Sequence, residues 1–177
     1  QIRGMMLVLW NIYNFFVTYA NLDSWGPNQK ESKRVVSENV LDRWALSKLN
    51  GLIMTVTESL DGYDTVAAIN NINAFISELS TWYIRQSRER VGPTVPNGVD
   101  KMAFYQTTYE VLTKLAQMLA PITPFLSEEI YRNLTNEVSV HLTYWPEAEK
   151  KLIDTELEKN MHSAMEVYSA VLMRRKT

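Results

Sequence analysis

Residues 65–90 read TVAAINNINAFISELSTWYIRQSRER, a stretch whose apolar side chains recur every three or four positions. This spacing places them on one face of an α-helix, which completes a turn about every 3.6 residues. The stripe consists of Ile69, Ile72, Phe75, Ile76, Leu79, Trp82 and Tyr83. The stretch therefore predicts a long helix whose apolar face lies against other helices.

The same helical period runs through most of the chain, and no segment alternates for long as a strand would. It predicts further helices at about residues 3–19, 37–60, 100–119, 124–134 and 156–175. The fold class is therefore all-α, a bundle of about five to six helices. Residues 138–146 are expected to form one short extended arm, or a short strand, that ends at Pro146.

Turn residues divide these helices. We expect one domain over residues 1–177, with an exposed linker at 21–37 that carries Gly26-Pro27 and a Pro/Gly loop at 91–99. Trp25 is expected to hold the linker against the body. Predicted helix caps are Asp64, Thr123 with Pro124 at the first helical position, and a capping box formed by Thr155 and Glu158.

Composition limits the classes of protein. The 177 residues are 46% hydrophobic and 21% charged, which is ordinary for a folded globular chain. No apolar run approaches the roughly 20 residues needed to cross a bilayer, so we expect no membrane association. The chain begins at Gln1 and stops within a basic helical pattern, so we expect it to be a fragment of a longer protein.

Catalytic and metal-binding patterns are not found in the sequence. There are no cysteines, and the two histidines, His141 and His162, lack the spacing of a helical metal pair. No phosphate-binding glycine loop, GxSxG elbow or HExxH pair occurs. The pair Glu128-Glu129 is interpreted as an exposed acidic pair near a helix N-terminus. We therefore expect no catalytic residue, no metal site and no cofactor in this segment.

Three arginines, Arg85, Arg88 and Arg90, gather at the end of the quoted stretch in a chain whose net charge is only −2. On a helical wheel Arg85 and Arg88 point away from the apolar stripe, whereas Arg90 extends it. One interpretation is that these cations only complement the dipole at a helix C-terminus. The other is that they meet the phosphates and unstacked bases of RNA, with Trp82 and Tyr83 as stacking residues if an edge stays accessible.

Other basic residues form a possible second patch in the linker, Lys30, Lys33 and Arg34, and a third cluster at the end of the chain, Arg174, Arg175 and Lys176. We expect the linker patch to contact RNA or another part of a larger protein. Asp42, Arg43 and Trp44 are interpreted as structural, with Trp44 in the core and the Asp-Arg pair in capping and local pairing. His141 and Trp145 are expected to pin the arm to the bundle.

Five strings in order resemble the anticodon-binding helical domain of isoleucyl-tRNA synthetase. They are LWNIYNFFVTYANLD (9–23), LDRWALSKLN (41–50), WYIRQSRER (82–90), APITPFLSEEIY (120–131) and SVHLTYWPEA (139–148). Valyl, leucyl and methionyl enzymes share the bundle and a helix like the fourth string. The pairing of the third string with the fifth is similar specifically to the isoleucine enzyme.

The resemblance implies a non-catalytic segment that binds the anticodon arm of isoleucine tRNA and joins the remaining domains of the same synthetase. It implies a cytoplasmic parent enzyme that uses ATP and Mg²⁺ to ligate isoleucine to its tRNA through an aminoacyl-adenylate. The implied RNA-binding residues are Arg85, Arg88, Arg90, Trp82, Tyr83 and Ser87. Two alternatives stay open, namely the same domain of a valyl, methionyl or leucyl enzyme, and a helical protein-docking module that binds no RNA.

Overall fold

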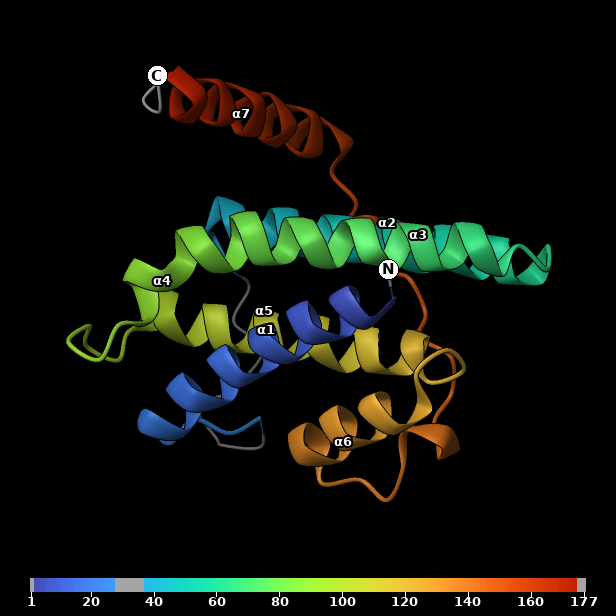
Figure 1. The fold of residues 1–177 in the computed structure, drawn as a ribbon. Coiled ribbons are helices and arrows are strands. Elements are labelled where there is room, and N and C mark those ends of the chain that lie inside the picture. The colour runs from blue at the N-terminus through green and yellow to red at the C-terminus, as the bar shows by residue number, and fades with distance from the viewer. Residues whose placement is uncertain (1, 28–36, 175–177) are drawn as a thin grey trace.

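A computed structural model describes residues 2–27 and 37–174, which form a bundle of helices (Figure 1). No strand occurs in this described part, which confirms the all-α prediction. The arm contains one 3₁₀ turn, Val140–Leu142, within otherwise extended chain. The α-helices are α1 (Ile2–Leu22), α2 (Val40–Asp61), α3 (Thr65–Glu78), α4 (Arg85–Val91), α5 (Val99–Leu119), α6 (Pro124–Thr135) and α7 (Thr155–Arg174).

The long helix predicted over residues 65–90 is divided in the structure. A π-helical segment, η1 (Leu79–Ile84), joins α3 to α4. The wider π turn shifts the helical register, so the buried positions continue as Leu79, Tyr83, Ile84, Ser87 and Val91, and Trp82 is only half-buried. Single π turns often occur at functional sites. This one leaves the indole of Trp82 at the surface of the bundle.

The core lies where α1, α2, α3 and α5 meet, and large side chains from each of them fill it. Trp44 is 2% exposed, as predicted, and Phe104 on α5 is fully buried. The rings of Tyr83 and Phe104 stack with centroids 5.6 Å apart. Trp25 packs against Phe16 with ring centroids 5.7 Å apart, which confirms that it holds the start of the linker to the body.

The helix caps agree only partly with the prediction. Asp64 caps α3 by accepting a hydrogen bond from the backbone N–H of Ala67. Pro124 is the first residue of α6, and Thr123 precedes it at the N-cap position. The predicted capping box of Thr155 and Glu158 is wrong. Asp154 accepts from the Leu157 N–H instead, and the Glu158 carboxylate accepts from the hydroxyl of Ser47 on α2.

The arm is fastened to the bundle at two places. The indole N–H of Trp145 donates to the hydroxyl of Thr57 at 2.8 Å, as its predicted role requires. The carboxylate of Glu128 accepts from the Ser139 hydroxyl and from the Val140 N–H, both at 2.9 Å. His141 is exposed. Its side chain does not pin the arm, contrary to the prediction.

Helix α7 stands apart from the other helices, above α2 and α3 in Figure 1. Met161 is the one side chain of α7 that is buried, among the residues the structure describes. No helix in this part of the chain is long and apolar enough to cross a membrane.

Candidate nucleic-acid interface

Arg85 and Arg88 are exposed on α4, as the helical wheel predicts. Each guanidinium lies over an aromatic ring from another helix. The Arg85 Cζ is 5.9 Å from the ring centroid of Tyr168 on α7, and the Arg88 Cζ is 5.9 Å from that of Phe15 on α1. These are cation–π distances. Neither arginine has a carboxylate partner within the described ranges 2–27 and 37–174, and both side chains are exposed.

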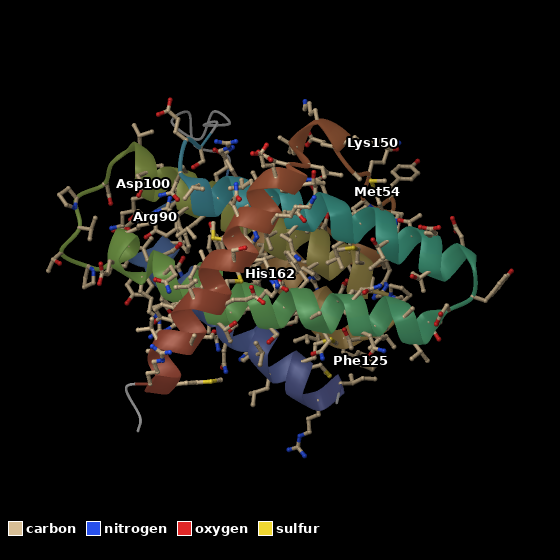
Figure 2. All side chains as sticks on the ribbon, turned by 90° about the horizontal axis from the view of Figure 1, so that it is seen from above. Met54, Arg90, Asp100, Phe125, Lys150 and His162 are labelled. Atoms are coloured by element: carbon tan, nitrogen blue, oxygen red, sulfur yellow. The ribbon has the colours of Figure 1, made fainter. Side chains whose placement is uncertain are left out.

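Arg90 turns inward and is only 11% exposed in its side chain. Its Nη1 and Nη2 donate to the two carboxylate oxygens of Asp42, both at 2.8 Å, which is a bidentate ion pair. Its Nε donates to Asp100 at 2.7 Å. Figure 2 shows Arg90 and Asp100 together at one corner of the bundle. Because Asp42, Arg90 and Asp100 begin or end three different helices, the ion pairs tie α2, α4 and α5 together.

Asp42 is fully buried and is the centre of this network. It accepts further hydrogen bonds from the Ser37 hydroxyl at 2.6 Å and from the Tyr83 hydroxyl at 2.8 Å. The predicted capping role for Asp42 is wrong, because Asn39 caps α2 by accepting from the Leu41 N–H. The four hydrogen bonds instead give a buried charge the compensation that it needs.

The network sets the charge of its members. Burial acts to lower the pKa of Arg90, but its hydrogen bonds to Asp42 and Asp100 outweigh burial and raise the pKa above the ordinary value. Burial, together with the negative charge of Asp42, raises the pKa of Tyr83 well above its ordinary value. At neutral pH the guanidinium is therefore charged and the phenol neutral, as the hydrogen bonds require.

Three of the six residues predicted to contact RNA, Tyr83, Ser87 and Arg90, lie inside the fold. Tyr83 and Ser87 are both 0% exposed, so they are not available to a ligand in this fold. Arg90 is committed to carboxylates, and the Ser87 hydroxyl accepts from its Nη1 at 3.3 Å. The string WYIRQSRER (82–90) therefore has two structural roles. Its inward residues build the corner, while its outward residues, Arg85 and Arg88, face solvent.

Trp82 belongs to η1 and is half-buried against α7. Its indole N–H donates to the sulfur of Met161 at 3.0 Å, and its ring meets that of Tyr168 edge to face at 5.5 Å. Trp82 is not fully buried, so it stays a predicted contact residue.

The structure describes only some of the remaining basic residues. Lys30, Lys33 and Arg34 lie outside the described residues, as do Arg175 and Lys176. Arg174 lies in the last turn of α7. The predicted pairing of Arg43 with its neighbour Asp42 is wrong. Arg43 pairs instead with Asp154, at 3.2 Å. The described part of the chain holds no cluster of His, Cys, Asp and Glu that could bind a metal ion.

Sequence reasoning missed Phe15 and Tyr168 at this interface. Each lies about 70 residues or more from the arginine it supports, and no spacing in the sequence relates them. Both belong to helices whose apolar periodicity indicates packing and gives no sign of a ligand.

The fold is found in a solved enzyme complex. The chain resembles LeuRS of Agrobacterium radiobacter K84 in a ternary complex with tRNA and LeuAMS, with a TM-score of 0.59 and 18% identity over 86% of this chain and 17% of that chain. At this identity the likeness shows the fold alone, that of a helical domain within a synthetase.

Sequence comparisons give the family. The family described as the anticodon-binding domain of tRNA ligase matches residues 42–177. Isoleucine–tRNA ligases of Dehalococcoides mccartyi (strain CBDB1), Clostridium novyi (strain NT) and Thermus thermophilus are 46%, 44% and 40% identical to this chain over 94%, 93% and 94% of its length. The chain belongs to the anticodon-binding domain family of tRNA ligases. It spans 17%, 16% and 16% of the length of these three relatives.

Proposed function

We propose that this chain is the part of an isoleucine–tRNA ligase that binds the anticodon arm of isoleucine tRNA. The family match and the isoleucine–tRNA ligase relatives support the assignment. The observation that carries RNA binding is a pair of exposed arginines on one short helix, Arg85 and Arg88, neither of which has a carboxylate partner among the described residues. In a chain with a net charge of −2, such a pair provides the local positive charge that a phosphate backbone needs.

The proposal gives each group at the corner one task. Arg85 and Arg88 contact phosphates or bases, and the accessible part of Trp82 stacks on an unpaired base. The buried ion pair of Arg90 with Asp42 holds α4 in place. Lys30, Lys33 and Arg34 are proposed as a secondary basic patch. Residues 1–177 act together as one domain.

Catalysis belongs to other parts of the proposed parent enzyme. That enzyme joins isoleucine to its tRNA through an aminoacyl-adenylate, and ATP and Mg²⁺ bind in its remaining domains. This chain contributes affinity and selection of the tRNA. We propose the cytoplasm as the location of the parent enzyme.

The alternatives rest on specific observations. The leucyl enzyme of similar fold favours the same domain of a related synthetase. Protein docking without RNA is favoured by exposed aromatic side chains away from α4, with Phe125 90% and Tyr144 94% exposed. Binding to RNA hairpins with different anticodons separates these functions from the proposed one.

The test measures binding of this chain to a fluorescein-labelled RNA hairpin with the sequence of an isoleucine tRNA anticodon arm, across a salt series. The slope of log K against log salt is expected to fall in magnitude by about 0.7 for each phosphate that a variant no longer neutralises. Arg85→Ala and Arg88→Ala are therefore expected to weaken binding and flatten the slope. Arg132→Ala removes another exposed arginine, on α6, and is the matched control.

Each outcome has a clear reading. Preference for the isoleucine anticodon over a swapped one supports the isoleucine enzyme, and preference for a leucine, valine or methionine anticodon supports the alternative synthetase. Binding that ignores salt and both α4 variants contradicts RNA binding at this corner and leaves the docking module.

A further inference from the structure

Helix α7 reaches the arginine corner through one aromatic side chain. Figure 2 looks down on α7 as it crosses the bundle, and Figure 1 shows its C-terminal end on the same side of the molecule as α4. Tyr168 lies in this C-terminal half and is half-buried. Its neighbours Val167 and Val171 are 64% and 52% exposed, so the surroundings of Tyr168 are open to solvent.

Tyr168 joins two groups that the proposed function already uses. The edge-to-face contact with Trp82 places the two rings 77° apart, and the guanidinium of Arg85 lies over the Tyr168 ring. A phenol, an indole and a guanidinium without a carboxylate partner in the described residues thus come from two segments about 80 residues apart in the sequence. Together they form a surface that is both aromatic and positively charged, which we call the Trp82–Arg85–Tyr168 platform.

This combination fits an unstacked nucleotide. Aromatic rings and guanidinium planes stack on the faces of bases, and the charge attracts the adjoining phosphate. Arg90 and Arg43 each have an aspartate partner, whereas Arg85 has no carboxylate partner among the described residues.

We propose that Tyr168 is an RNA-contacting residue and that the interface extends from α4 onto α7, where the Trp82–Arg85–Tyr168 platform stacks on an unpaired base of the bound RNA. The inference rests on the proposed function and adds a second helix to its site. It also gives α7, which packs sparsely against the bundle, a role in binding.

The experiment compares three variants of this chain against the same RNA hairpin over the same salt series. Tyr168→Leu removes the ring but keeps an apolar side chain against Trp82, and Tyr168→Phe keeps the ring. Tyr144→Leu is the matched control, because Tyr144 is an exposed tyrosine whose carbonyl contacts Gln117, at the end of α5 remote from Asp100. Circular dichroism checks that α7 remains helical in each variant.

Loss of stacking lowers affinity without removing a phosphate contact. We therefore expect Tyr168→Leu to bind roughly 10- to 100-fold more weakly with an unchanged salt slope, and Tyr168→Phe and Tyr144→Leu to bind like the wild type. A hairpin with bromouridine in its loop should also photocross-link to the α7 peptide that contains Tyr168.

Three results would overturn the inference. If Tyr168→Leu binds normally while Arg85→Ala binds weakly, Tyr168 makes no contact and the proposed function still stands. If Tyr168→Leu flattens the salt slope as Arg85→Ala does, Tyr168 acts only by positioning the guanidinium. If neither variant changes binding, the inference and the proposed function fail together.

Discussion

The substitution Arg90→Met removes the buried ion pair between Arg90 and Asp42 and tests how much this pair contributes to the free energy of unfolding. Methionine keeps an unbranched apolar stem like that of arginine but has no guanidinium, so it leaves the Asp42 carboxylate without a cation. Asp42 is 0% exposed, so its charge depends on the protein groups around it. We therefore expect the variant to fold less stably.

The magnitude follows from the contacts. Removing one partner of a buried ion pair costs about 3–5 kcal/mol, because the remaining charge is left uncompensated. Asp42 keeps the hydrogen bonds from Ser37 and Tyr83, which favours the lower end, about 3 kcal/mol. The pair of Arg90 with Asp100 adds less, since the Asp100 side chain is 54% exposed and exposed pairs contribute about 0–1 kcal/mol.

The assay is urea unfolding followed by circular dichroism at neutral pH, with the free energy extrapolated to zero denaturant. Asp100→Asn is the control and should lose no more than about 1 kcal/mol. The double variant Asp42→Asn/Arg90→Met should lose less than the two single variants added together, because it leaves no unpaired charge.

Two results would refute this reasoning. A loss below about 1 kcal/mol for Arg90→Met would mean that the ion pair contributes no more than a surface pair. Strict additivity in the double variant would mean that Asp42 and Arg90 act independently, which the bidentate geometry does not allow.

Two further predictions concern the linker and α7. Burial acts to raise the pKa of Asp23, but hydrogen bonds from Lys101 and Tyr105 outweigh burial and lower it. An aspartate with a lowered folded pKa contributes stability that is present above its unfolded pKa of about 3.9 and lost as pH falls through the folded pKa. Asp23→Asn should therefore flatten the fall of the urea midpoint below about pH 4, and an unchanged acid limb would contradict this. Ser47 donates to Glu158 and accepts from the backbone N–H of Asp154 at 2.8 Å. Ser47→Ala should cost about 1–2 kcal/mol and speed hydrogen exchange in α7 more than in α5, whereas equal exchange would show that α7 is held elsewhere.

Local sequence patterns correctly predicted, for several residues, which side chains face the core and which face solvent. The helical wheel put Arg85 and Arg88 outside and Arg90 inside, and the structure confirms all three placements. Trp44 and Trp25 are buried or packed as expected. The predictions within helices succeed because the face of a helix that a residue occupies depends on its position in the repeat.

The string that carries the predicted RNA contacts does not by itself separate inward from outward residues. Tyr83, Ser87 and Arg90 belong to the same string as Arg85 and Arg88, yet they build the corner. The π turn also lay beyond the sequence pattern, since an ideal α-helical repeat assumes one constant register. Trp82 lies in that turn, and α7 covers part of it.

The sequence by itself determined the all-α class, the approximate helix positions and the cluster of arginines at the end of the long amphipathic stretch. Only the tertiary structure decided what those arginines meet. Arg90 and Asp42 are 48 residues apart, and Arg85 and Tyr168 are further apart still. Contacts at such separations depend on how whole helices cross, which is set by the packing of the entire core and not by the spacing within any one segment.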